Sequence, residues 1–159
     1  MSYKIDLHAL YNWSKLWDMK CNMDKCKRIH YRKNNPENVY TMNNIHITKD
    51  EQEKDLGIIF QKDLKFSQHI SSKINKANSI LSLINRTFSF KDQSTFLRPY
   101  VALVRPHVEY GNTIWFQHLR KDINALEKMQ MRATKLIPDI RHLGYEERLK
   151  VLKLPSRNF

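Results

Sequence analysis

The spacing of apolar residues changes once along this chain, between about Gln61 and Phe66. Before this point, apolar and polar residues alternate in short runs that turn-forming residues separate, which is typical of β-strands. After it, apolar residues recur every three or four positions, which is typical of amphipathic helices. The sequence therefore predicts an α+β fold in two parts. Residues 1–62 form an N-terminal helix on a small antiparallel sheet, and residues 63–159 form an all-helical bundle.

The helix of the first part is expected at residues 3–19. Its wide apolar stripe includes Trp13 and Trp17. Two indole rings on so short a helix need a large apolar surface to cover them, so we expect the stripe to pack on the sheet.

The strands of the first part are marked by alternation and by turn residues. Residues 26–32 alternate as a strand does, and Asn43-Asn44 tolerates the positive φ of a tight hairpin turn between strands at 39–42 and 45–48. The apolar run 56–60 predicts a further strand. Gly57 within that run indicates a bulge, or a close approach of the backbone to a ligand.

Four helices are expected in the second part. Ser67 has the side chain of an N-cap residue. The helix that follows it carries an apolar stripe at steps of four and three, formed by Ile70, Ile74, Ala77, Leu81, Ile84 and Phe88. Further helices are expected from about Asp92, from Asp122 to Ile137, and from Tyr145 to Lys153, the last two ending before a proline.

The stretch from Tyr100 to Phe116 is the densest in apolar and aromatic residues. Because Pro99 and Pro106 lack a backbone donor, we expect a helix up to about Val104, a kink at Pro106 and a second short piece that Gly111 ends. Arg105 and Glu109 are four residues apart. Arg105 is equally suited to pairing with Glu109 across the bend and to contacting a phosphate.

The net charge of +12 is concentrated in the second part of the chain. Residues 1–60 contain 10 Lys and Arg against 8 Asp and Glu, whereas residues 61–159 contain 18 against 8. An excess of this kind favours a polyanionic partner, with nucleic acid ahead of an anionic membrane surface. The alternative is that these lysines are simply solvated and bind no partner.

No run of apolar residues has the length of a membrane span, and the first ten residues do not have a signal-peptide profile. We therefore expect a nuclear or cytoplasmic protein with reduced thiols at Cys21 and Cys26.

The sequence shows no self-sufficient active site. Cys21, Cys26 and His30 have irregular spacing for zinc and no fourth ligand at a usual distance, so we expect no metal site. The three glycines are too dispersed for a phosphate-binding loop, and no nucleophile elbow is present. The acidic residues at 50–55 crowd one segment, which favours a solvated turn.

Six segments, in this order and spacing, resemble the C-terminal part of the reverse transcriptase of non-LTR retrotransposons of the jockey and chicken-repeat-1 kind. They are LYNWSKLWDMKCNMDKCKRIHY (10–31), EKDLGIIFQKDLKFSQHI (53–70), KANSILSLINRTF (76–88), YVALVRPHVEYGNTIW (100–115), LEKMQMRATKLIP (126–138) and YEERLKVLKLP (145–155). The resemblance implies part of a polymerase palm followed by a thumb. The missing palm and fingers of the parent polymerase would then be partners of this chain.

The resemblance also assigns expected roles to single residues. Lys25 matches a lysine near the incoming triphosphate, and Leu56, Gly57 and Ile58 are similar to the primer grip. The parent polymerase would need a divalent metal such as Mg²⁺, held by two adjacent aspartates. This sequence contains no such pair. We therefore expect no catalytic residue and no bound cofactor in this chain, and no primer extension by it alone.

The expected function is binding of an RNA/DNA template–primer duplex through its sugar–phosphate backbone. The basic residues expected to contact phosphates are Lys73, Lys76, Arg86, Arg105, Lys128, Arg132 and Lys135. Two alternatives remain. One is a stand-alone basic nucleic-acid-binding protein, and the other is a protein-interaction module whose apolar face docks a partner.

Overall fold

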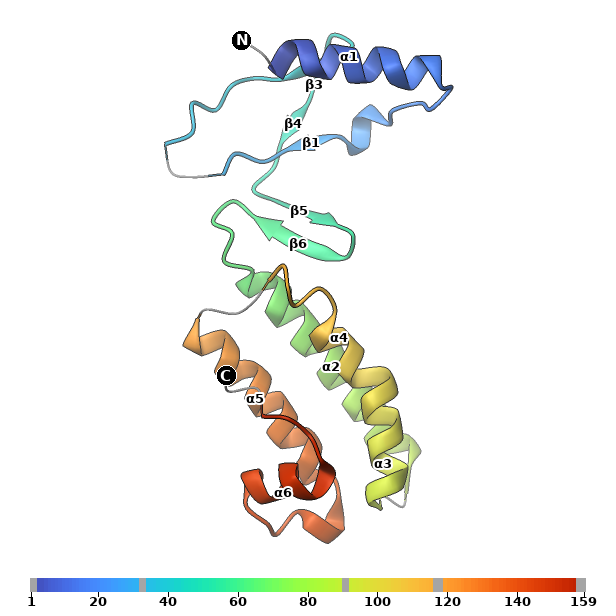
Figure 1. The fold of residues 1–159 in the computed structure, drawn as a ribbon, viewed down its shortest axis with the longest axis vertical. Helices are drawn as coiled ribbons and strands as arrows, with labels where there is room; N and C mark the ends of the chain where they lie inside the picture. Colours follow the sequence, from blue (N-terminus) through green and yellow to red (C-terminus); the bar gives the residue numbers. More distant parts are fainter. Residues whose placement is uncertain (1–2, 32–33, 90–91, 116–118, 157–159) are drawn as a thin grey trace. The chain divides into compact units, whose positions relative to one another are not determined.

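The structure is a computed structural model that describes residues 3–31, 34–89, 92–115 and 119–156. The fold is α+β, as the sequence predicts, and the chain divides into two compact units, Met1–Lys65 and Phe66–Phe159 (Figure 1). We call them the sheet unit and the helical unit. The boundary lies three residues after the expected one.

The sheet unit combines one α-helix with three sheets of two strands each among its described residues. Strands β1 and β4 pair in parallel, whereas β2 pairs with β3 and β5 with β6 in antiparallel hairpins. Its elements in chain order are α1 (Tyr3–Leu16), the 3₁₀-helix η1 (Met23–Lys25), β1 (Lys27–Arg28), β2 (Thr41–Met42), β3 (Ile45–His46), β4 (Thr48–Lys49), β5 (Gln52–Asp55) and β6 (Ile58–Gln61).

The two hairpin turns have the same backbone geometry but different sequences. Asn43 and Asn44 have φ of 51° and 60°, which confirms the predicted turn. Leu56 and Gly57, with φ of 44° and 81°, form the turn between β5 and β6. The strand predicted at 56–60 is present but begins at Ile58, and the predicted bulge at Gly57 is wrong because Gly57 lies in the turn. Leucine is an unusual residue at positive φ, so its apolar side chain was assigned to the strand.

The acidic segment also differs from the prediction of a turn. Asp50 and Glu51 precede the strand, but β5 itself contains Glu53 and Asp55. Its hairpin partner β6 places Phe60 opposite Glu53 and Ile58 opposite Asp55. Backbone pairing with an apolar strand has overridden the low strand propensity of the acids.

The aromatic stripe of α1 is exposed, contrary to the prediction that it packs on a sheet. Trp13 is 49% exposed and Trp17 is 64% exposed, and their rings contact each other at 6.4 Å between centroids. The strand in contact with α1 is β2, which has only two residues. A strand this short offers too little apolar surface to cover two indole rings. Ser14 is the residue of α1 that is buried among those whose side chains are described.

The helical unit is built from two long helices and several shorter segments. Its elements are α2 (Ser67–Thr87), α3 (Gln93–Pro99), the π-helix η2 (Tyr100–Val104), α4 (Arg105–Glu109), α5 (Arg120–Lys135), the 3₁₀-helix η3 (Pro138–Ile140) and α6 (Tyr145–Leu152). Helix α2 packs against both α4 and α5, and α6 packs on α5 (Figure 1). The fully buried core includes Ile70, Phe96, Tyr100, Val104, Leu126 and Met129.

The region around the two prolines confirms the predicted boundaries and adds a wide helical turn. The segment up to Val104 is helical and α4 ends just before Tyr110, with Gly111 at φ 67° beyond it. Between the prolines the backbone N–H of Arg105 donates to the carbonyl of Tyr100, five residues earlier. This π-turn takes up the register that Pro106 disturbs by lacking a donor. Phe116, the last residue of the stretch, lies outside the described residues.

Ser67 does not cap α2, contrary to prediction. The cap residue is Phe66, in the left-handed region at φ 56°, and Ser67 is the first helical residue. The Ser67 hydroxyl donates to Asp122 Oδ2 of α5 at 2.9 Å, a partner 55 residues away that no local pattern indicates. None of the described helices is both long and apolar enough to cross a membrane.

We predict that the sheet unit exchanges its backbone amides faster than the helical unit. Strands of two to four residues and an exposed α1 stripe leave the sheet unit with few buried apolar contacts, and such regions open at a lower free energy. Hydrogen exchange of the whole chain measures this, with amides of α2 and α5 as the internal reference. Equal protection of β5–β6 and of α2 would contradict it.

Candidate functional site

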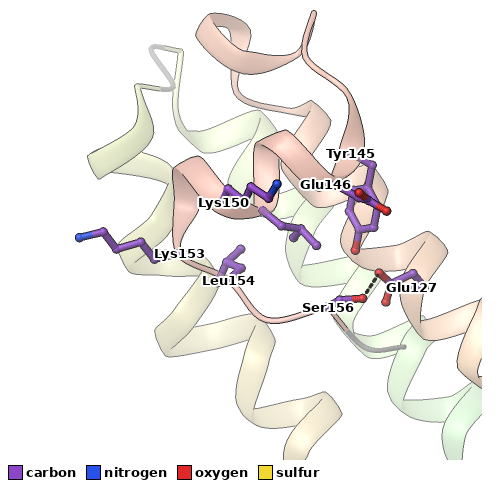
Figure 2. A pocket seen from close by; sticks show the side chains of 8 residues that line it. Glu127, Tyr145, Glu146, Lys150, Lys153, Leu154 and Ser156 are labelled. Carbon is purple, nitrogen blue, oxygen red and sulfur yellow. Dashed lines mark hydrogen bonds between the residues drawn. The ribbon is translucent and has the colours of Figure 1, made fainter. Parts of the chain in front are cut away.

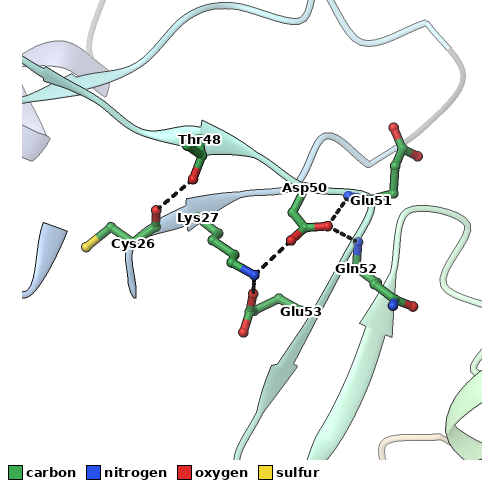
Figure 3. Close-up of polar contacts among 7 residues, drawn as sticks. All are labelled: Cys26, Lys27, Thr48, Asp50, Glu51, Gln52 and Glu53. Carbon is green, nitrogen blue, oxygen red and sulfur yellow. Dashed lines mark hydrogen bonds and ion pairs between the residues drawn. The ribbon is translucent and has the colours of Figure 1, made fainter. Parts of the chain in front are cut away.

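Four lysines of the sheet unit lie in ion pairs with neighbouring carboxylates. Lys27 Nζ lies 2.9 Å from Asp50 Oδ2 and 3.1 Å from Glu53 Oε2 (Figure 3). Lys49 contacts Glu37 at 2.8 Å. The hydrogen bond from Lys27 lowers the pKa of Asp50. The carboxylates of Asp50 and Glu53 in turn raise the pKa of Lys27. Longer ion pairs at 3.5 and 3.7 Å involve Lys62 with Glu51 and Lys65 with Asp63. Lys15, Lys20, Lys25 and Lys54 of this unit are exposed and have no ion pair among the described residues.

Helix α5 presents a different arrangement, which we call the α5 stripe. Its members are Lys121, Lys128, Arg132 and Lys135. Steps of seven, four and three residues place them on one side of the helix, and all four are exposed. Among the described residues, no ion pair involves any of them. The sequence predicted three of these residues and missed Lys121, whose helical step of seven to Lys128 was the available signal.

A cavity between α2 and α5 adjoins the stripe. It has a volume of about 280 Å³ and is open to solvent. Arg132 and Leu136 line it from α5, and the lining from α2 consists of Asn78, Leu81, Ser82 and Asn85. The polar lining residues of α2 recur at steps of four and three. They form a polar stripe beside the apolar stripe of the same helix.

The predicted basic residues of α2 do not gather at this cavity. Lys76 and Arg86 are exposed on α2 but do not line the cavity. Lys73 is half-buried, with its Nζ 5.5 Å from the ring centroid of Tyr110. A cation over an aromatic face is attracted to the ring, so this amine is less available to a phosphate. The predicted set is therefore brought together only on α5.

Arg105 pairs with Glu109. The Arg105 Nε donates to Glu109 Oε1 at 2.7 Å, both side chains being about a third exposed. Of the two roles weighed for Arg105, this geometry favours the ion pair that spans α4.

The residues that resemble a nucleotide and primer site lie in the sheet unit. Lys25 is exposed at the end of η1, a turn that Asn22 caps by accepting the backbone N–H groups of Asp24 and Lys25. Leu56 is 82% exposed at the tip of the β5–β6 turn, whereas Ile58 is 2% exposed at the start of β6. Ile58 is thus a core residue of the hairpin. Leu56 and Gly57 are the two residues of the turn itself.

The residues present do not fit the divalent metal that the sequence resemblance implies. The sequence has no adjacent aspartates. Within the described ranges, no group of three or more His, Cys, Asp and Glu residues is placed to hold an ion. We therefore assign no metal-dependent step to this chain.

Comparisons with protein-family models, with curated proteins and with solved structures find nothing that matches this chain. The resemblance to reverse transcriptases rests on the six sequence segments alone.

We predict that Asp50→Asn destabilises the sheet unit near neutral pH and has little effect in acid. Because the folded-state pKa of Asp50 is lowered, its stabilising contribution is present above the unfolded pKa of about 3.9 and is lost as pH falls through the folded value. Hydrogen exchange of β1 and β5 amides at pH 7 and near pH 3 measures the difference.

Asp24→Asn is the matched control, since Asp24 is an exposed carboxylate whose side chain has no ion pair among the described residues. An Asp50→Asn effect that is equal at both pH values would show that the substitution acts through packing, and not through the charge of Asp50.

Proposed function

We propose that the helical unit binds double-stranded nucleic acid through its sugar–phosphate backbone, with the α5 stripe as the main contact. The observation that carries the proposal is the row of exposed cations on one side of α5. None of the four has an ion pair among the described residues, whereas four lysines of the sheet unit are held by carboxylates. Exposed cations along one helix face release counterions when they contact phosphates, and this supplies most of non-specific binding.

The dimensions of the stripe suit a duplex backbone. Lys128 and Lys135 are separated by about 10 Å along the helix axis, at roughly 1.5 Å per residue. Phosphates of one strand follow each other at about 3.4 Å along the duplex axis, so the part of the stripe from Lys128 to Lys135 spans about three of them. Arg132 lies between these two lysines and also lines the cavity, where its guanidinium and the amides of Asn78 and Asn85 offer hydrogen-bond donors.

The chemistry of this surface favours a duplex over a single strand. Proteins that hold single strands stack the bases on aromatic side chains. Neither the α5 stripe nor the lining of the α2–α5 cavity includes an aromatic ring. Contacts restricted to phosphate and sugar position a protein without reading sequence, so we propose binding with little base preference.

The resemblance to a reverse transcriptase places this activity in a wider setting. On that reading the chain is a palm and thumb part of a retroelement polymerase, and its duplex would be the template–primer hybrid. The residues of this chain bind and orient such a duplex but supply no carboxylate pair for nucleotide addition.

We predict that the triple substitution Lys128→Ala, Arg132→Ala and Lys135→Ala weakens duplex binding and its dependence on salt. Each lost phosphate contact lowers the slope of log affinity against log salt by about 0.9, so three contacts lower it by roughly 2 to 3. Fluorescence anisotropy with a labelled RNA/DNA hybrid, over a series of salt concentrations, measures both quantities.

The control removes three charges from the sheet unit by Lys15→Ala, Lys20→Ala and Lys54→Ala, all at exposed positions. It has the same net charge as the α5 variant and is expected to keep most of the salt slope. Equal losses in the two triple variants would show that only net charge matters, and would reject the α5 stripe as the contact.

The exposed side of α1 favours a second function, that of a protein-interaction module. Leu10, Trp13, Leu16 and Trp17 are each about half exposed or more. Contiguous apolar residues of this kind mark interaction sites more often than they remain uncovered.

We predict on this basis that the chain associates with itself or with a partner in a way that high salt does not weaken. Trp13→Ser with Trp17→Ser is expected to abolish concentration-dependent association in sedimentation velocity, because burial of the indole rings drives it. Leu64→Ser, at an exposed apolar residue outside α1, is the control. A monomer at all concentrations, with no difference among the variants, would reject this function for the isolated chain.

A further inference from the structure

The cavity between α2 and α5 has a cation in its lining and no acid. Its polar lining consists of one guanidinium, two carboxamides and one hydroxyl, from Arg132, Asn78, Asn85 and Ser82. The Ser82 hydroxyl donates to the backbone carbonyl of Asn78 at 3.0 Å. The donors that remain for a ligand are therefore the guanidinium and the two carboxamides.

The two helices that form this cavity expose no carboxylate. Helix α2 contains no Asp or Glu in its 21 residues. The two acids of α5, Asp122 and Glu127, are each only 6% exposed. The exposed Lys128 and Lys135 lie on either side of Arg132 along α5. The outward charges of these helices are thus all positive, which favours an anion as the ligand of the cavity.

The cavity between α5, α6 and the segment after α6 has mixed charges instead (Figure 2). Glu127 and Glu146 both line it, together with Lys150 and Lys153. The Ser156 hydroxyl already donates to Glu127 Oε1 at 3.2 Å (Figure 2). With both signs of charge in its lining, that cavity selects neither an anion nor a cation.

The donors of the α2–α5 cavity are not used by the fold. Among the described residues, no ion pair or hydrogen bond engages the Arg132 guanidinium or the side-chain amides of Asn78 and Asn85. The cavity has a volume of about 280 Å³ and opens to solvent, whereas sites for whole small molecules begin at roughly 300 Å³. It therefore suits one group of a larger ligand.

Arg132 connects the cavity to the α5 stripe, because it is a member of both. A ligand that contacts the cavity and the stripe together must carry a series of anionic groups, as a sugar–phosphate backbone does. A guanidinium binds a phosphate through two parallel N–H···O bonds, and the carboxamides can donate to further oxygens of the same group.

We propose that the α2–α5 cavity is a binding site for one phosphate group, which in the complex is a backbone phosphate of the duplex. The Arg132 guanidinium makes the bidentate contact, and Asn78 and Asn85 donate from α2. This inference rests on the proposed function for the source of the phosphate. The lysines of the stripe act as point charges, whereas the phosphate held in the cavity fixes the position of α5 along the duplex backbone.

Arg132→Lys separates this site from simple charge. The variant keeps the positive charge, so the slope of log affinity against log salt is expected to stay unchanged. Lysine cannot make the bidentate contact, so the affinity for a labelled RNA/DNA hybrid is expected to fall about fivefold or more at every salt concentration. Fluorescence anisotropy measures both quantities.

Arg86→Lys is the matched control, because Arg86 is an exposed arginine of α2 that does not line the cavity. Its exchange is expected to change the affinity by less than about twofold. If Arg132→Lys weakens the hybrid no more than Arg86→Lys does, the phosphate site is wrong, although duplex binding by the α5 stripe stands.

Inorganic phosphate tests the site without nucleic acid. In ¹⁵N NMR of the full chain, phosphate added in exchange for chloride at constant ionic strength is expected to shift the side-chain amide signals of Asn78 and Asn85 until they saturate. The signal of Asn112, which is exposed outside the cavity, is expected to stay in place. Arg132→Ala is expected to abolish the shifts, because it removes the charged donor.

The absence of a saturable shift up to about 50 mM phosphate, or shifts that persist in Arg132→Ala, overturn the proposal. Saturable shifts in a chain that binds no hybrid have a different meaning. They would support the phosphate site, reject the proposed function, and assign the site to a phosphate group of a ligand other than the duplex.

Discussion

The packing of α2 on α5 is the contact on which the helical unit depends. Ala77 on α2 and Ala133 on α5 are both fully buried, and side chains this small allow two helices to approach closely. Leu126 and Met129, three residues apart on the same side of α5, are also in the core. The Ser67–Asp122 hydrogen bond joins the N-terminal ends of the two helices. Because this packing fixes how α5 is rotated, it also decides which residues of α5 face solvent.

The rotation of α5 gives its two sides different chemistry. The outward side carries the α5 stripe, whereas the inward side contains buried polar residues beside the apolar ones, namely Glu127, Gln130 and Thr134. Buried polar groups need hydrogen-bond partners. Gln130 donates to the carbonyl of Pro155 at 2.8 Å, and Arg148 of α6 donates to the Thr134 hydroxyl at 3.0 Å. These bonds hold α6 and the C-terminal segment on α5.

The sequence predicted the parts of the fold that local chemistry decides. The Asn43-Asn44 turn, the helices of the second part and the exposure of Lys128, Arg132 and Lys135 all follow from residue type and period. The prediction from sequence failed where a residue distant in the chain determines the local structure. Ser67 bonds Asp122 instead of capping its own helix, and Leu56 adopts a positive φ because β5 and β6 pair around it. The stripe of α1 was assigned to the core because its period is helical, but period alone does not show that a covering surface exists.

In the candidate site, too, local chemistry was predictable from the sequence and contacts between distant residues were not. Charge composition located the excess of cations in the second part of the chain, but it could not separate paired from unpaired lysines. That separation depends on strand register, since the β1–β4 pairing brings Lys27 near Asp50, 23 residues away. In the sheet unit, Lys27, Lys49, Lys62 and Lys65 each have a carboxylate within reach, and these pairs join parts of the fold. On α5, the nearest acids of the same helix, Asp122 and Glu127, are turned into the core by the packing on α2 and α6. The burial of these two acids leaves the stripe without counter-charges on its own helix, and this is the reason for our proposal that its partner is an external polyanion.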